Sequence, residues 1–156
     1  MKQGTICRTR GTKSPNAAKL HEHIHAINTN RQTICIRQQN TNKSLISQLD
    51  LLMSLRRTDY DICLIQKPYV NFKGMTQANV NWTILYPTTH TAHPDATRAV
   101  TLINTRILSD TWTQIPIESP NMIVVIIQGE FGTMRIVNIY NDCNHNKTLK
   151  KLATHL

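Results

Sequence analysis

The sequence is short of acidic residues, aromatic residues and long apolar runs, and each shortage restricts what the protein does. Asp and Glu together number nine against eighteen Lys and Arg, which leaves a formal net charge of +9. Aromatic residues make up 5% of the chain, and no apolar run approaches the length that spans a bilayer. The N-terminus also lacks the apolar centre of a secretory signal. We therefore expect an intracellular protein without a membrane partner.

Closely spaced cysteine pairs are also missing. The four cysteines are Cys7, Cys35, Cys63 and Cys143, none of them in a CxxC pair, and two lie in apolar segments typical of β-strands. A disulfide framework or a structural zinc site needs a denser pattern. The sequence therefore predicts reduced thiols, most of them in the core.

The positive charge is concentrated near the N-terminus. Residues 1–43 contain eight Lys and Arg against a single Glu, a net charge of +7, whereas the remainder contains ten against eight. Residues 1–32 have few large apolar side chains and no sustained hydrophobic period, so we predict a flexible basic arm. Such an arm attracts nucleic acid weakly and in a salt-dependent way. A solvated tail without a partner and an organelle transit peptide are the alternatives.

From residue 33 onward, strand and helix patterns alternate. Residues 33–40 and 61–66 read as strands, and between them Leu45, Leu49, Leu52 and Met53 follow a helical period after Ser44. A strand, a helix and a strand in about 35 residues favour parallel pairing of the two strands. Further strands are predicted at 82–87, 98–104 and 111–117, a hairpin at 122–140 around Gly129-Glu130-Phe131-Gly132, and a helix at 146–156 with Leu149, Leu152, Ala153 and Leu156 on one face.

Polar side chains follow three of the predicted strands. Asn40 ends the first, Lys67 follows the second, and Tyr140 ends the second strand of the hairpin. Functional groups concentrate at strand ends in α/β proteins. If these ends lie on one rim, an amide, a cation and a phenol converge there. Trp82 and Tyr86, four residues apart, share a strand face and are expected to pack in the core.

The order of these segments amounts to a resemblance. Four segments carry it: Q-x-N-x-N-K-S before the helix (residues 38–44), I-Q-x-P-Y after the second strand (65–69), and "RAVTLINTRI" and "FGTMRIVNIYND" farther on. In this order they resemble the front half of the endonuclease/exonuclease/phosphatase superfamily, in the form carried by non-LTR retrotransposons. The resemblance covers residues 33–156. It implies an α/β fold of the DNase I-like type, which is an incomplete four-layer α/β sandwich of two packed β-sheets with outer helices. Residues 33–156 are then the truncated N-terminal part of such a domain.

The resemblance also implies roles for the three strand-end residues. Asn40 matches an asparagine that helps to position the metal and the catalytic groups, and Tyr140 matches a tyrosine that hydrogen-bonds near the scissile phosphate. Lys67 stands where the family has a glutamate that ligates Mg²⁺. The family continues to G-D-x-N and S-D-H motifs, and this sequence ends at Leu156 before either.

The lysine at position 67, in place of the family's glutamate, is expected to prevent Mg²⁺ binding at this position. Mg²⁺ takes oxygen ligands, and an ammonium group offers neither a lone pair nor a negative charge. Asp142 is the one carboxylate expected near the rim, too little for metal-assisted hydrolysis. Two further hypotheses concern histidines: a general base at His145, and metal binding by the group His21, His23 and His25 or by the pair His90 and His93. A solvated or helix-capping role is the stronger interpretation of these residues.

Two functions follow as expectations. The first is a remnant of a Mg-dependent DNA endonuclease of a non-LTR retrotransposon, without Mg²⁺ and inactive in this chain. Its expected location is intracellular, with the nucleus as a candidate compartment. The alternative is a non-catalytic module that binds DNA weakly and electrostatically through the basic arm and Lys67.

Overall fold

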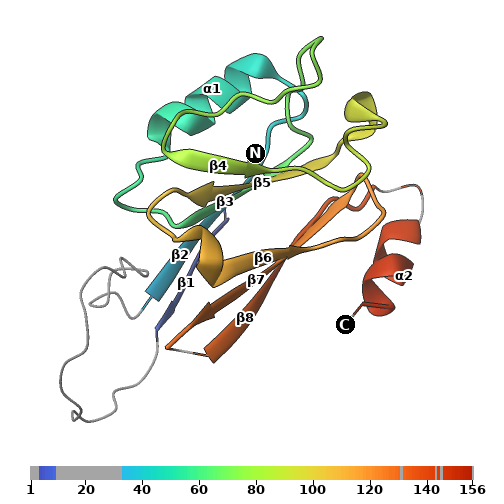
Figure 1. Cartoon of the computed structure of the whole chain (residues 1–156). Coiled ribbons are helices and arrows are strands. Elements are labelled where there is room, and N and C mark those ends of the chain that lie inside the picture. Colours follow the sequence, from blue (N-terminus) through green and yellow to red (C-terminus); the bar gives the residue numbers. More distant parts are fainter. Residues whose placement is uncertain (1–3, 10–32, 131, 143, 145, 156) are drawn as a thin grey trace, which may run out of the picture.

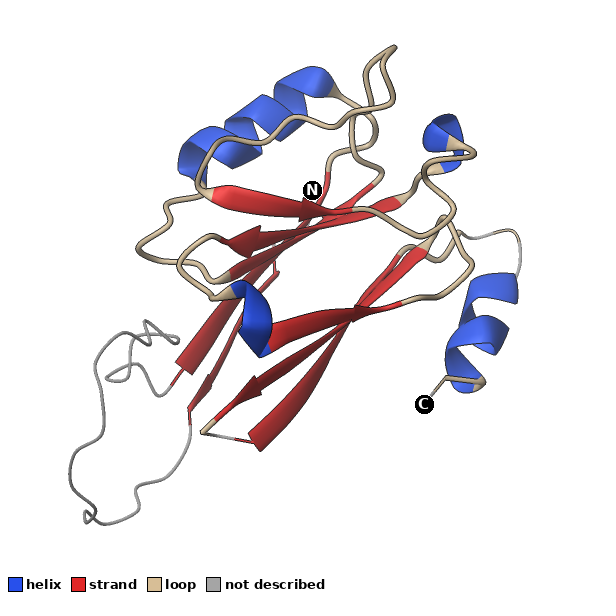
Figure 2. Ribbon diagram, in the orientation of Figure 1, coloured by secondary structure: helices blue, strands red, loops and turns tan. Residues whose placement is uncertain are grey.

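The computed structural model of the chain describes residues 4–9, 33–130, 132–142, 144 and 146–155, with the backbone alone for residues 4–9 (Figures 1 and 2). The strands are β1 (Gly4–Thr9), β2 (Thr33–Asn40), β3 (Ile62–Gln66), β4 (Trp82–Leu85), β5 (Ala99–Asn104), β6 (Trp112–Ile115), β7 (Met122–Gly129) and β8 (Gly132–Ile139). The helices are α1 (Leu45–Ser54), α2 (Lys147–Ala153) and two single 3₁₀ turns, η1 (Pro94–Ala96) and η2 (Ser109–Thr111).

The strands form two sheets. A five-stranded sheet has the order β1-β2-β3-β5-β4, and a three-stranded sheet has the order β6-β7-β8. β2 and β3 run parallel, as the strand-helix-strand pattern predicts, and the other pairs are antiparallel. The predicted hairpin is confirmed: β7 and β8 pair over their whole length, with Gly129 opposite Gly132.

Three apolar clusters divide the domain into four layers. Strand side chains alternate between the two faces of a sheet, so Ile62 and Leu64 of β3 enter the core between the sheets, while Cys63 and Ile65 pack under α1 with Leu51. A third cluster lies on the outer face of β7, where α2 contributes Leu152. The order helix, sheet, sheet, helix confirms the predicted α/β sandwich with outer helices (Figure 1). Trp82 is buried in the cluster under α1 and Tyr86 packs against it, so the predicted core contact is confirmed.

The N-terminal arm contains a strand that the sequence analysis missed. β1 pairs antiparallel with β2, from Gly4 opposite Gln38 to Thr9 opposite Thr33. Pairing joins backbone groups, so six residues need no hydrophobic period to cover the edge that β2 would otherwise leave open. The prediction of an arm outside the fold is therefore wrong for these six residues. The rest of that arm lies outside the described residues.

Helix α1 turns a different face inward from the predicted one. Ser44 caps the helix as expected, its Oγ accepting a hydrogen bond of 3.2 Å from the Ser47 N–H. The buried side chains, however, are Gln48 and Leu51, whereas Leu49 is 43% and Met53 84% exposed. The helix is apolar around more than half of its circumference, so periodicity alone does not determine which face packs. Gln48 is tolerated inside because its amide finds hydrogen-bond partners.

Helix α2 also differs from the prediction. Thr148 and Leu152 face the sheet, while Leu149 is 45% exposed and Ala153 is exposed. The Thr148 hydroxyl is inside because it accepts a hydrogen bond of 3.0 Å from the Asn121 amide. No helix in the described ranges is long and apolar enough to cross a membrane.

Candidate functional site

The three strand ends singled out in the sequence meet at one rim of the two sheets. Because β2 and β3 are parallel, their carboxyl ends coincide, with Asn40 directly opposite Gln66. The Gln66 side chain then reaches the other sheet, donating a hydrogen bond of 2.7 Å to the Ile139 carbonyl at the end of β8. Lys67 and Tyr140 are the next residues along. The predicted convergence is therefore present.

The turn after β2 is held against the residue after β3. The Thr41 Oγ and the Lys43 N–H both donate to the Lys67 carbonyl, at 2.8 and 2.7 Å. Asn42 and Lys43 have positive φ, and the Asn40 Oδ1 accepts a hydrogen bond of 2.9 Å from the Asn42 N–H. The Asn40 side-chain oxygen thus shapes the turn that starts α1.

Lys67 occupies the centre of the rim. Its φ of 47° lies in the left-handed region, which a non-glycine residue rarely adopts, and its N–H donates to the Arg98 carbonyl at 2.8 Å. The Lys67 Nζ donates to Asn42 Oδ1 at 3.3 Å and lies 5.4 Å from the centre of the Tyr140 ring, a cation–π distance. The backbone geometry and both contacts direct the ammonium to the place where the three strand ends meet.

Two further cations, which the sequence analysis did not single out, border Lys67. Burial, and then the charges of Arg98 and Lys67, lower the pKa of Lys43, while Asp95 opposes them. The loop of η1 brings these groups together: the Arg98 guanidinium donates to the Asp95 carbonyl at 2.9 Å, and the Lys43 Nζ lies 3.5 Å from the same oxygen. The only signal in the sequence is that Arg98 is the first residue of a predicted strand, whereas the observed β5 begins at Ala99. We call Lys43, Lys67 and Arg98 the rim cations.

The described carboxylates near the rim have partners within the protein. Asp142 accepts a hydrogen bond of 2.9 Å from the Asn144 N–H, so it shapes its own loop, and Asp95, which the sequence analysis also missed, faces Lys43. Within the described part of the chain, no three His, Cys, Asp or Glu side chains gather as metal ligands would. Lys43 and Arg98, two cations beside the Lys67 ammonium, do not suit a divalent cation.

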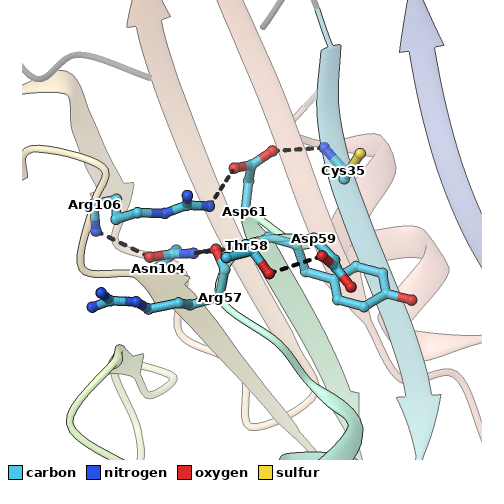
Figure 3. A network of polar contacts seen from close by, with 8 residues as sticks. Cys35, Arg57, Thr58, Asp59, Asp61, Asn104 and Arg106 are labelled. Carbon is cyan, nitrogen blue, oxygen red and sulfur yellow. Dashed lines mark hydrogen bonds and ion pairs between the residues drawn. The ribbon is translucent and has the colours of Figure 1, made fainter. Parts of the chain in front are cut away.

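Asp61 is at the end of β3 opposite to the rim. Its Oδ2 accepts a hydrogen bond of 2.8 Å from the Cys35 N–H, and its Oδ1 lies 3.9 Å from the Arg106 guanidinium (Figure 3). In the same network Asn104 donates to the carbonyls of Arg57 and Tyr60, at 2.7 and 2.8 Å. This buried carboxylate joins β2, β3 and β5 and is far from the rim.

The His90 ring has structural partners on its face and at both of its nitrogens. His90 is stacked on Tyr86 with ring centres 3.9 Å apart, and its two ring nitrogens lie 2.7 Å from Thr97 Oγ1 and from the Gly74 carbonyl. Both nitrogens are thus occupied, which argues against the metal-ligand hypothesis for His90 and His93. The side chains of His21, His23, His25 and His145 lie outside the described residues.

Of the cysteines, Cys63 is fully buried, in agreement with the predicted core position, and Cys35 is half-buried. Burial raises the pKa of the Cys63 thiol to about 12. The thiols of Cys7 and Cys143 are outside the described part. Cys63 therefore has the character of a packing residue and not of a nucleophile.

Comparison with known proteins identifies the fold. No family model matches the sequence, and no curated protein matches it. Among solved structures, the chain is similar to the endonuclease domain of TRAS1, a telomere-specific non-LTR retrotransposon, with a TM-score of 0.60 and 21% sequence identity. The match covers 78% of this chain and 52% of that one. The chain thus has the fold of that solved domain, in agreement with the DNase I-like fold that its motifs predicted, and spans about half the length of that domain.

Proposed function

We propose that this chain is an endonuclease-like domain whose rim binds the phosphate backbone of DNA without hydrolysing it. The observation that carries the proposal is the position of the Lys67 ammonium, at the meeting point of three strand ends and beside Lys43 and Arg98. Their mutual repulsion, which contributes to the lowered pKa of Lys43, is relieved when an anion binds between them. A DNA phosphate supplies such an anion.

The side chains around Lys67 support binding in a defined place. Tyr140 packs its ring near the ammonium and Asn42 holds it by a hydrogen bond, so the cation loses less side-chain entropy on binding than a lysine on an open surface. The Asn42 amide remains close enough to act as a second polar contact. These contacts carry no base information, and we therefore propose binding that does not depend on sequence.

The absence of hydrolysis is proposed from the donor set. Water attacks a phosphodiester readily when a metal ion or a positioned base activates it. Lys67 stands where the resemblance places the metal-ligand glutamate, and its charge reverses the local field. Asp142 and Asp95 have other partners. We assign no catalytic step to Asn40 or Tyr140 in this chain; by family resemblance they mark where the chemistry of an intact relative takes place.

Binding is tested by fluorescence anisotropy of a labelled DNA duplex at several salt concentrations. Lys67→Glu replaces an attraction by a repulsion, so we expect a loss of about 1–2 kcal/mol, or about five- to thirtyfold in affinity, and a salt slope smaller by about one. Arg57→Glu makes the same change in charge at the opposite end of the domain, where the Arg57 carbonyl bonds to Asn104. This control should change affinity less than Lys67→Glu. Equal effects of the two substitutions would refute a binding site at the rim.

Catalysis is tested separately on supercoiled plasmid with Mg²⁺, and with EDTA as the control. We expect no nicking above the EDTA background by the wild type or by Lys67→Glu, because restoring one carboxylate does not supply the remaining ligands or a base. Nicking by the wild type that EDTA abolishes and Tyr140→Phe reduces would show that the domain is a nuclease and would overturn the non-catalytic part of the proposal.

A further inference from the structure

Helix α1 and the loop beside it expose a large apolar surface. Seven of the eight large apolar side chains that are exposed in the described residues lie on these two segments: Leu45, Ile46, Leu49, Met53, Phe72, Met75 and Val80, which we call the α1 patch. Phe72 and Val80 are 94% and 93% exposed. An aromatic side chain alone has on the order of 150–250 Å² of surface, and monomeric proteins rarely expose contiguous apolar areas above a few hundred Å².

The two segments are joined along their length, which makes the patch one surface. The buried Gln48 amide donates to Thr76 Oγ1 and to the Gln77 carbonyl, at 2.7 and 2.8 Å, and its oxygen accepts from the Tyr69 N–H at 2.8 Å. One turn beyond the helix, Arg57 donates to Asn81 Oδ1 at 3.4 Å. The loop therefore runs beside α1 toward its carboxyl end, and Figure 1 shows it next to the helix on the outer side of the large sheet.

The shape of the patch fits a helix. On α1, Ile46, Leu49 and Met53 are spaced by three, four and seven residues and form a stripe about 10 Å long, which is the pattern of ridges that a second helix packs against. Here α1 covers one face of the large sheet, so a partner on the helix meets side chains and not the backbone of a strand. A strand therefore gains no backbone pairing there, whereas an amphipathic helix buries the stripe.

The charges around the patch indicate the sign of the charge that a partner carries. Arg57 and Lys73 are exposed at its border, and Lys73 lies over the Phe72 ring, 5.7 Å from its centre. A second copy of this chain is disfavoured, because antiparallel packing of two α1 helices sets Arg57 of one beside Lys43 of the other. The exposed carboxylate of Asp50 lies in the middle of the helix, so the acidic side chains of a partner belong at the two ends, beside Arg57 and Lys73. An anionic membrane is disfavoured because its headgroups would lie along the whole helix, Asp50 included.

We propose that the α1 patch is a docking surface for an amphipathic helix with acidic flanks, belonging to a partner protein. The helix lies along α1, its apolar side chains contacting Met53 and Phe72 and its acidic side chains facing Arg57 and Lys73.

The test uses the full chain and labelled synthetic peptides of roughly 18 residues, long enough to form a helix on binding. The probe has a leucine face with glutamate flanks; one control carries lysine in place of glutamate, and another has the probe's composition in a scrambled order. By anisotropy we expect the acidic peptide to bind at least about tenfold more tightly than either control. Equal binding of the probe and the scrambled peptide overturns the proposal.

Variants locate the binding. Ile46→Ser combined with Met53→Ser alters exposed side chains, so the fold should persist, and it should weaken the acidic peptide about tenfold or more. Leu149→Ser, on the exposed face of α2, is the matched control and should have no effect. Arg57→Glu with Lys73→Glu should reverse the preference in favour of the lysine peptide. If Leu149→Ser weakens binding as much as the double variant, the patch is not the docking surface.

Two further results would assign the patch to another occupant and overturn the proposal. One is a dimer in sedimentation velocity that Met53→Ser dissociates. The other is retention of the chain on phosphatidylserine vesicles that depends on Met53 while the acidic peptide does not bind.

Discussion

Asn138 offers the sharpest test of how the two sheets are joined at the rim. It is 1% exposed on β8, two residues before Tyr140. Its Nδ2 donates across the sandwich to the Val100 carbonyl at 2.8 Å, and lies 3.3 Å from both the Ile65 carbonyl and Thr101 Oγ1. Its Oδ1 is a buried oxygen that has no hydrogen-bond partner within the described residues. The amide thus holds the end of β8 against the large sheet through its donor side.

Asn138→Asp keeps the shape and removes the donor. A carboxylate oxygen then lies where the nitrogen was, facing the carbonyls of Val100 and Ile65. The lost hydrogen bonds and the acceptors left unpaired cost about 1–3 kcal/mol, and burying the ionised carboxylate brings the total to about 3–5 kcal/mol at pH 7. Burial and the facing oxygens should raise the pKa of the new carboxyl above its ordinary value of about 3.9.

The raised pKa of the new carboxyl determines how the stability of the Asn138→Asp variant depends on pH. Between the unfolded and the folded pKa, the folded state holds a proton that the unfolded state has released, so stability falls by about 1.4 kcal/mol per unit as the pH rises through that window. Lowering the pH restores a donor and should recover stability relative to the wild type. Urea denaturation at pH 5, 6, 7 and 8 measures this, with Asn138→Ala as a control that adds no titrating group. An Asp variant whose stability runs parallel to that of Asn138→Ala at every pH would refute the reasoning.

Two other predictions concern groups with shifted pKa values. Because burial raises the pKa of Cys63 to about 12, iodoacetamide at pH 8 should leave Cys63 unmodified in the folded protein and should alkylate it in urea. Peptide mass spectrometry measures both, and equal labelling in the two states would contradict the buried position. Lys67→Glu should raise the pKa of Lys43, because it removes one of the cations that lower this pKa, whereas Arg57→Glu should not. NMR titration of the lysine side chains measures both effects. A pKa of Lys43 that Lys67→Glu leaves unchanged would place the two ammonium groups too far apart to share a phosphate.

The sequence by itself determined the local elements. Alternation of apolar residues located β2, a short apolar run located β3, and the glycines at 129 and 132 between two apolar segments located the β7–β8 hairpin. The change to a helical period after Ser44 located α1, because side-chain direction repeats with the backbone geometry. Strand order along the chain placed Asn40 and Lys67 at neighbouring strand ends, since a right-handed crossover returns a parallel strand to the same edge. The motifs that contain these residues also indicated the fold.

Only the tertiary structure decided what each element faces and which distant residues meet. Apolar spacing on α1 allowed more than one inward face, and the hydrogen bonds of Gln48 to the 69–77 loop selected the one that leaves Met53 in solvent. Arg98 joins Lys43 and Lys67 because β5 runs antiparallel to β3, a pairing made by backbone groups with no signature in the side chains. Contacts between segments depend on which surfaces are buried together, and that free energy is a property of the whole sandwich, which no short stretch of sequence contains.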